Sequence, residues 1–365
     1  MRAGSVGPGR RAARAAFVLL AAAWLALGSC TRKPPQFVPA GADSSAAVGA
    51  DSFAVLVGAA LEQWDSQDGA TAAPATARLL LDDLRRHPDQ RLAGRARTFV
   101  DSCGFSAEVA GTVDLAAASF FSRSDPGGES WPFLFWRDAD AVRFEAVEGG
   151  GMRLLDLAAR PADPASPGTP QQAAAIYGRA GPRGQQPVVI AWRRPPDGKR
   201  WAMAQTLGPD SLGGVGSAEF VGQPGGGTGL EARTYRPTAG FDECPTCPHV
   251  QRTLRFDWGP DGFRKTSEEV ASTPYYAFVQ FIAALSVNDR EMAQRLVSDA
   301  SLLDAAAQSE WGKSKGLWRL APGTDESADE MTFFRGAREA YKVRFTSRDG
   351  RWIITDLHPT QRSVE

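Results

Sequence analysis

The chain has 365 residues, of which 43% are hydrophobic and 23% charged, a composition typical of folded proteins that excludes disorder of the whole chain. Lys and Arg number 41 and Asp and Glu 42, so the formal net charge is −1. This balance gives no general attraction to nucleic acid or to anionic lipid headgroups, and we expect no nucleic-acid partner. The length allows two or three compact domains.

Residues 1–29 have the order of an export signal. Four arginines, the last of them Arg14, precede the apolar run 17–27, which is too short to cross a bilayer of about 30 Å. The step Leu27-Gly28-Ser29-Cys30 resembles the lipobox of bacterial lipoproteins, in which the cysteine receives a diacylglycerol and becomes the first residue of the mature chain. The resemblance implies acyl chains such as palmitate on Cys30 and the membrane as a partner through this anchor. An ordinary secretory signal cut near Ser29, with Cys30 left as a thiol, is the alternative.

Residues 30–50 predict a flexible tether. The segment contains several prolines and is otherwise rich in Ala, Gly and Ser, so it has too little apolar surface to fold by itself. Twenty such residues would hold the first domain about 25 Å from the membrane. Thr31 follows the cysteine, and by the same resemblance this favours the outer membrane, facing the periplasm, in a bacterium with two membranes.

Residues 51–106 predict a small helical unit. In the first segment the apolar residues recur at helical spacing and form one stripe, from Phe53 to Trp64. We expect a second helix to begin near Pro74 and to end before Pro88, because proline suits a first helical turn and does not continue a helix. A third helix is expected over 91–102.

Residues 107–270 predict an antiparallel β domain. Apolar runs alternate with turn sequences: 187–192 and 201–203 flank one turn, and 254–258 precedes another that ends before Phe263. This spacing favours a sandwich, a barrel or an open meander. Five tryptophans of this region either fill its core or line a groove for a glycan, a peptide or an apolar ligand: Trp131, Trp136, Trp192, Trp201 and Trp258.

Residues 271–365 predict a small α+β domain. Thr273 caps a helix with Pro274 at its first position, and Asn288 with Glu291 is the expected cap of a second helix. Strands are expected at 317–320, 331–334, 341–345 and 352–357. Over 272–360 this order, with the D-G-x-W-x-I-x-D hairpin that begins at Asp349, is similar to NTF2-like domains, a family that includes enzymes and binding modules. The predicted fold class is therefore α+β and multi-domain: an N-terminal helical unit, a central antiparallel β domain and a C-terminal NTF2-like domain.

Three further cysteines follow Cys30, and for a compartment that oxidises thiols we predict a small structural disulfide between Cys244 and Cys247. Pairing of Cys103 with one of the two is the competing structural interpretation. The C-x-x-C spacing also occurs in redox dithiols, but those lie at a helix N-terminus, whereas this pair precedes a predicted strand. Zinc would require Cys244, Cys247 and His249, with or without Cys103, to converge.

No other motif predicts catalysis. His87, His249 and His358 each adjoin a proline and lack a second ligand at metal spacing, so surface or capping roles are expected. We therefore predict no catalytic residue, metal or cofactor, and a lipid-anchored extracytoplasmic protein that binds an unknown protein or small molecule or acts as an envelope scaffold. The alternative is an extracytoplasmic enzyme, either a thiol oxidoreductase through Cys244 and Cys247 or an enzyme with an NTF2-like pocket.

Overall fold

The computed structural model describes residues 50–66, 68–138, 141–161, 170–195, 200–223, 227–245, 247–325 and 327–361, without the side chains of residues 50 and 51. The contacts divide the chain at residue 50, and the second unit, Ala50–Glu365, contains all described residues. The export signal, Cys30 and the tether up to residue 49 lie outside the described residues. In the described part, no helix is both long and apolar enough to cross a membrane.

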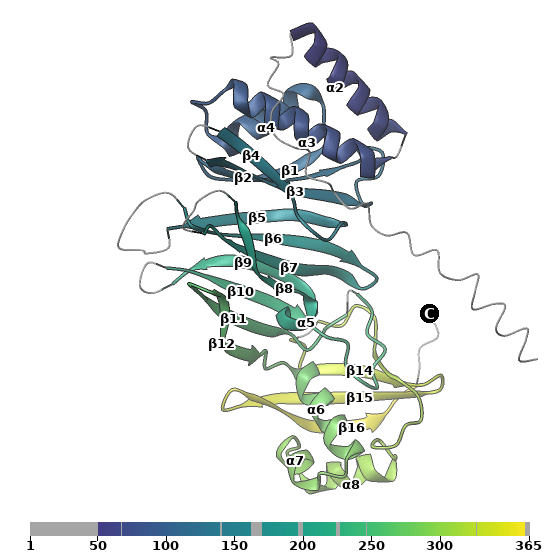
Figure 1. The fold of residues 1–365 in the computed structure, drawn as a ribbon. Helices are drawn as coiled ribbons and strands as arrows, with labels where there is room; N and C mark the ends of the chain where they lie inside the picture. Colours follow the sequence, from purple (N-terminus) through teal and green to yellow (C-terminus); the bar gives the residue numbers. More distant parts are fainter. Residues whose placement is uncertain are drawn as a thin grey trace, which may run out of the picture. The chain divides into compact units, whose positions relative to one another are not determined.

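The described residues contain four antiparallel sheets of four strands, and within each sheet every strand pairs with the next one along the chain (Figure 1). The first sheet comprises β1 (Ala107–Gly111), β2 (Leu115–Phe121), β3 (Ser130–Asp138) and β4 (Ala141–Ala146). The second comprises β5 (Met152–Arg160), β6 (Gln172–Gly181), β7 (Gly184–Arg193) and β8 (Ala202–Leu207). The third comprises β9 (Val215–Gly222), β10 (Thr228–Tyr235), β11 (Arg252–Gly259) and β12 (Gly262–Val270), with α5 (Pro209–Leu212) before it. The fourth comprises β13 (Trp318–Leu320), β14 (Glu330–Arg335), β15 (Glu339–Arg348) and β16 (Arg351–Pro359).

Two helices, α3 (Gly69–Arg86) and α4 (Leu92–Cys103), cover one face of the first sheet, and α2 (Ala50–Asp65) packs mainly on α3 (Figure 1). The apolar stripes of α3 and α4, including Leu80 and Phe99, share one core with Phe120 and Phe133 of the sheet. The second helix begins earlier than predicted, because Asp68 caps it by accepting a hydrogen bond from the backbone N–H of Thr71 at 3.2 Å. Pro74 therefore lies inside α3.

The first three sheets are joined face to face by apolar cores. Leu134 and Trp136 of the first sheet pack with Tyr177 and Ile190 of the second. The opposite face of the second sheet packs on the third through another core: Ala174, Ile176 and Val189 contact the cluster of Leu230, Ala232, Leu254 and Phe256. Because both faces of the second sheet are covered, the run from Gln172 to Gly178 in β6 is buried without alternation.

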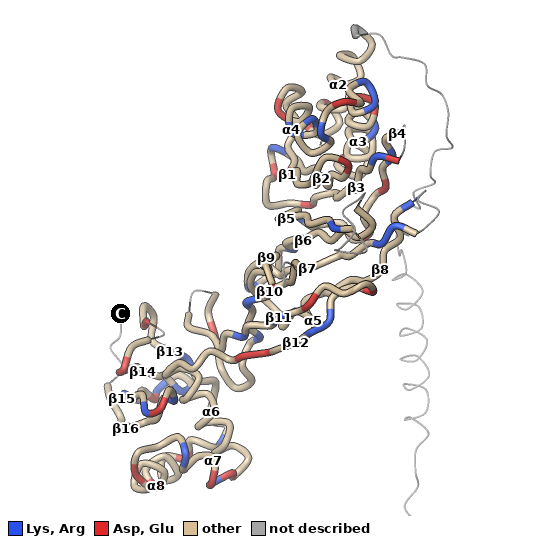
Figure 2. Tube along the Cα trace, turned by 90° about the vertical axis from the view of Figure 1, so that its left-hand side faces the viewer, with Lys and Arg blue, Asp and Glu red and all other residues tan. Residues whose placement is uncertain are grey.

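The outer face of the third sheet carries charges instead of another sheet. Glu231 accepts hydrogen bonds from Arg233 at 2.9 Å and from Arg255 at 3.0 Å, and Arg255 also pairs with Glu269 at 2.9 Å. Along β12 a basic stretch is followed by an acidic one (Figure 2). Covering this face with a further sheet would bury these charges, and the cost of removing them from water opposes that packing.

The fourth sheet packs against α6 (Pro274–Ser286), α7 (Arg290–Arg295) and α8 (Ala300–Gln308) (Figure 1). Aromatic rings fill its core: Phe278 stacks on Phe333 with ring centroids 3.7 Å apart, and Trp311 is 1% exposed. Thr273 caps α6 as predicted, whereas Asp289, and not Asn288, caps α7. At the turn between β15 and β16, Asp349 and Gly350 have φ of 51° and 75°, which suits a two-residue hairpin turn.

The predicted fold class is wrong. Of the described residues, 43% lie in strands and 26% in helices, and the architecture is four antiparallel four-stranded sheets with a few helices. The N-terminal helices are not a helical unit of their own, because their apolar faces are buried against the first sheet. Helical periodicity identifies the buried face of a helix but does not identify the element that covers it, and this is why the error arose.

Candidate functional site

The connection between β10 and β11, residues 236–251, contains three of the residues that the sequence marked as chemical candidates: Cys244, Cys247 and His249. It leaves the third sheet and runs along the edge of the fourth, where Phe241 forms a parallel bridge with Trp318. The backbone N–H of Trp318 donates to the carbonyl of Gly240 at 2.9 Å, and the N–H of Asp242 donates to the carbonyl of Trp318 at 2.8 Å. Phe241 and Val250 belong to the core of the fourth sheet. We call residues 236–251 the connecting segment.

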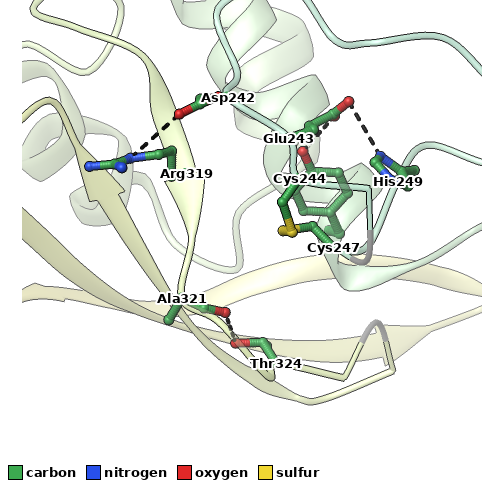
Figure 3. The surroundings of a disulfide bond; sticks show 9 residues. Asp242, Glu243, Cys244, Cys247, His249, Arg319, Ala321 and Thr324 are labelled. Carbon is green, nitrogen blue, oxygen red and sulfur yellow. Dashed lines mark hydrogen bonds and ion pairs between the residues drawn. A yellow bond between two sulfur atoms is a disulfide. The ribbon is translucent and has the colours of Figure 1, made fainter. Parts of the chain in front are cut away.

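The connecting segment contains the disulfide. The Sγ atoms of Cys244 and Cys247 lie 2.10 Å apart, and the N–H of Cys247 donates to the carbonyl of Cys244 at 3.1 Å, which closes a tight turn (Figure 3). The pair that the sequence predicted to bond is thus at disulfide distance. Cys244 is exposed and Cys247 is half-buried.

An apolar groove of about 270 Å³ lies beside the disulfide. Leu320, Pro322 and Phe334 of the fourth sheet region line it together with the two cysteines. At one end, Arg319 and Asp242 form an ion pair at 3.9 Å between Nε and Oδ2 (Figure 3). Both side chains are more than a third exposed, so the pair contributes little to stability.

A buried polar cluster lies on the other side of the segment. The carboxylate of Glu243, 3% exposed, accepts hydrogen bonds from the hydroxyl of Tyr275 at 2.7 Å and from the backbone N–H of Thr238 at 3.2 Å. His249 Nδ1 lies 3.4 Å from Glu243 Oε2, and the His249 ring stacks on Tyr235 with centroids 3.6 Å apart. Tyr275 begins α6, so the carboxylate links the connecting segment to the helices of the fourth sheet.

Burial and hydrogen bonding act in opposite directions on this carboxylate. Burial alone raises the pKa of Glu243, but the hydrogen bonds from His249, Tyr275 and Thr238 outweigh it and hold the pKa below its ordinary value. Burial, together with the neighbouring Glu243 carboxylate, raises the pKa of Tyr275. Near pH 7 the cluster therefore contains the ionised carboxylate of Glu243 and the neutral phenol of Tyr275. The hydrogen bond between them fastens the connecting segment to α6.

The zinc site that the sequence left open does not form. The two sulfur atoms are bonded to each other, and Cys103 lies on α4 beside the core of the first sheet. No group of three or more His, Cys, Asp or Glu side chains in the described part of the chain could hold a metal ion. Burial raises the pKa of the Cys103 thiol, which keeps it protonated and weakly reactive.

The remaining predicted candidates lie apart from the connecting segment. His87 ends α3, with Nδ1 2.8 Å from the carbonyl of Asp83, and His358 is exposed. His249, which lies in the connecting segment, was expected in a surface or capping role. It is 4% exposed and stacks on Tyr235, so that prediction is wrong. Four of the five tryptophans fill cores, and Trp131 is partly buried: Trp136, Trp192, Trp201 and Trp258 are each less than 8% exposed.

Sequence reasoning missed Glu243 and Tyr275. Both stand at positions without a recognisable motif, and their partner atoms come from residues 5 to 32 positions away. The one feature of the sequence that could have drawn attention to Glu243 is its position directly before Cys244.

No protein-family model matches the chain, and no curated protein matches it at a significant level.

Proposed function

We propose that the chain is a lipid-anchored protein of the bacterial cell envelope that has a binding or scaffold role and no catalysis of its own. Cys30 carries the acyl chains, and the outer membrane, facing the periplasm, is the proposed location. The observation that carries the proposal is the structural role of these polar and sulfur-containing residues. The disulfide closes a turn within the connecting segment, and the Glu243 carboxylate links that segment to α6, next to its backbone bridge to the fourth sheet.

The disulfide supports an extracytoplasmic location. Disulfides persist in oxidising compartments such as the periplasm and are rare in the bacterial cytosol. The pair closes a turn at an exposed position, where cytosolic reductants would reach it. The export signal and the lipobox resemblance point to the same compartment, and two or three acyl chains make a stable anchor.

The filled interior of the fourth sheet and its helices supports a binding role over an enzyme with an NTF2-like pocket. Such an enzyme needs a pocket with an inward acid or histidine between sheet and helices. Here Phe278, Trp311 and Phe333 fill the interior with aromatic rings, and no acid or histidine in the described part of the chain lines the pocket between α6, α7 (Arg290–Arg295) and β16. Arg335, 2% exposed, lies in the same interior. It donates to Glu339 at 2.5 Å and to the backbone carbonyls of Glu310 at 3.0 Å and Ser309 at 2.8 Å. Its charge is therefore paired within the fold, and its hydrogen bonds join β14 to the end of α8.

One observation favours the alternative of a thiol oxidoreductase. Cys244 is exposed beside an apolar groove, and exposed disulfides exchange with thiols more readily than buried ones. Against it, the pair lies in a turn between two strands, without the helix N-terminus that lowers the pKa of a catalytic thiol.

Two measurements test the proposal. Labelling the native host with an alkyne analogue of palmitate should mark the wild-type protein and the control Cys103→Ser, and Cys30→Ala should lose both the label and the membrane fraction. A label on Cys30→Ala, or its full retention on membranes, would contradict the lipid anchor.

A reductase assay with insulin tests the absence of thiol catalysis. We expect the wild-type protein and Cys244→Ser/Cys247→Ser to give the same rate as buffer. A wild-type rate well above that of the double variant would establish the oxidoreductase instead.

A further inference from the structure

A pocket of about 310 Å³ opens between α6, α7 and the start of β16, away from the disulfide. Its volume lies at the lower end of the range of small-molecule sites, about 300–1,000 Å³. Tyr276 and Gln280 line it from α6, Arg295 from α7, and Arg351 and Trp352 from β16. In Figure 1, α6 packs on β16 of the fourth sheet and α7 lies next to α6.

Hydrogen bonds fix the walls of this pocket relative to one another. The end of α7 is bound to β16, because the N–H of Ile354 donates to the carbonyl of Leu296 and the N–H of Ser298 donates to the carbonyl of Ile354, both at 2.8 Å. The start of α6 is bound to the hairpin turn by the hydroxyl of Ser272, which donates to the carbonyl of Gly350 at 3.1 Å. A ligand therefore meets a pocket that is already formed, which lowers the entropy cost of binding.

The pocket has an apolar floor and a polar rim. Leu296 and Ala277, 8% and 3% exposed, form the floor, and the half-buried ring of Trp352 stands beside it. On the rim, Gln280 Nε2 donates to the hydroxyl of Tyr276 at 2.7 Å, which orients that hydroxyl. A ring lying on an aromatic wall with its polar groups on the rim suits this layout.

Both charged side chains that line the pocket are arginines, Arg295 and Arg351. Arg295 pairs with Glu291 one helical turn earlier, but the two side chains are 64% and 80% exposed, so the pair is weak and the guanidinium stays accessible to a ligand. Guanidinium groups bind carboxylates and phosphates through two parallel hydrogen bonds. The charge of the pocket therefore selects an anion.

We propose that this pocket binds a small anionic ligand in which a carboxylate or phosphate is attached to a ring, such as an acidic sugar. Arg351 and Arg295 hold the anionic group, and the ring lies over Trp352 and Tyr276. The inference rests on the proposed binding role and names the class of ligand.

Calorimetric titration of the full chain in detergent tests this site with three sugars of the same ring size: glucuronate, glucose 6-phosphate and glucose. We expect saturable binding of at least one anionic sugar and binding of glucose at least about tenfold weaker. The two anionic sugars distinguish a carboxylate from a phosphate ligand. Equal binding of glucose, or no saturable binding of either anionic sugar at millimolar concentrations, overturns the proposal.

Two arginine variants test whether the anionic sugar binds in this pocket. Arg351→Gln should weaken the anionic sugar about tenfold or more, equivalent to ~1.4 kcal/mol. Arg348→Gln is the matched control, because Arg348 stands directly opposite Arg351 in the same hairpin and does not line the pocket. The affinity of the Arg348→Gln variant for the anionic sugar should stay within about twofold of that of the wild type. An equal loss in both variants would show nonspecific attraction to the hairpin and contradict the site.

Glu291→Gln should act in the opposite direction. Removing the carboxylate that competes for Arg295 should tighten binding of the anionic sugar about twofold to fivefold. Weaker binding in this variant would contradict the role of Arg295. Failure of these titrations leaves the lipid anchor and the absence of thiol catalysis untouched, and those are measured separately by palmitate labelling and the reductase assay.

Discussion

Neighbouring sheets are joined in two physically different ways in this molecule. The second sheet meets the first and the third mainly through apolar side chains, such as Ala175 on one face and Ile176 on the other, both 0% exposed. Two ion pairs, Arg153 with Glu108 and Arg194 with Asp138, also link the first and second sheets beside this core. The connecting segment meets the fourth sheet and α6 through a small apolar contact at Phe241 and a buried carboxylate at Glu243, and a disulfide closes a turn within the segment itself.

The difference decides which conditions each junction responds to. Apolar burial is non-directional, scales with the area removed from water and does not depend on protonation or redox state. A buried hydrogen-bonded carboxylate depends on pH, and a disulfide depends on the redox poise of its compartment. The connecting segment should therefore be sensitive to acid and to reductants, whereas the apolar cores of the sheet stack should respond chiefly to mutations that change their packing.

The largest effect is expected from a charge placed between the first and second sheets. Ala175→Asp would bury a carboxylate without a partner and should lower the free energy of unfolding by about 4 kcal/mol or more, enough to prevent folding. Ser217→Asp is the control, because Ser217 is exposed on the outer face of the third sheet and pairs with Arg233 across the strands. Its effect in urea unfolding should stay within about 0.5 kcal/mol. Similar losses in both variants would mean that the stack is not the apolar junction described here.

A smaller loss is expected at the apolar contact of the connecting segment. Phe241, 8% exposed, packs edge-on against Tyr275 and Phe278 with ring centroids 6.0 and 6.2 Å apart. Phe241→Ala should lower the free energy of unfolding by about 3–4 kcal/mol in urea. Leu317→Ala is the control, because Leu317 is 53% exposed and stands directly before β13, the strand to which Phe241 is bridged. It should change the free energy of unfolding by less than about 0.5 kcal/mol. A loss below 1 kcal/mol for Phe241→Ala would show that the segment is not anchored there.

The carboxylate of the connecting segment should make this junction pH-dependent. Because the pKa of Glu243 is lower in the folded protein than in the unfolded chain, its ionised form stabilises the fold above the unfolded value of about 4.3, and this contribution disappears as the pH falls through the folded pKa. Glu243→Gln should therefore lower the free energy of unfolding by about 1–3 kcal/mol at pH 7. The difference from the wild type should shrink as the pH falls below the ordinary carboxyl range, measured by urea unfolding across a pH series. Glu219→Gln, at a side chain 63% exposed, is the control. A difference that is the same at every pH would contradict this assignment.

The disulfide should contribute least. Closing a loop this short removes little entropy from the unfolded chain, about 2 kcal/mol or less. Cys244→Ser/Cys247→Ser should therefore lower the melting temperature slightly and leave the fold intact by circular dichroism. Mass analysis after alkylation of the unreduced, unfolded wild type should find one reactive thiol, at Cys103. Three reactive thiols would exclude the disulfide in the isolated protein.

Local elements were predicted well and their assembly poorly. The strand at 341–345 lies within β15, and the hairpin turn at Arg348-Asp349-Gly350 was found from its own residues. The same reasoning placed the start of α3 at Pro74, because Asp68 carries the cap without an obvious pattern around it. It also separated the N-terminal helices from the sheet that covers them.

The candidate site divides in the same manner. The pairing of Cys244 with Cys247 follows from spacing and compartment, whereas the burial of His249 and its position beside Glu243 depend on Tyr235 and Tyr275, which come from a strand and a helix on either side of the connecting segment. The residues that line the pocket around Arg351 were not identified from the sequence, since they come from three elements.

The sequence by itself thus determined the elements, the turns and the closest cysteine pair, because each depends on residues within a few positions of one another. Only the tertiary structure decided which sheet packs against the N-terminal helices, which carboxylate is buried beside His249, and that Arg295 and Arg351 line the same pocket. Periodicity reports which side of an element faces inward, and contacts between distant segments decide what that side meets.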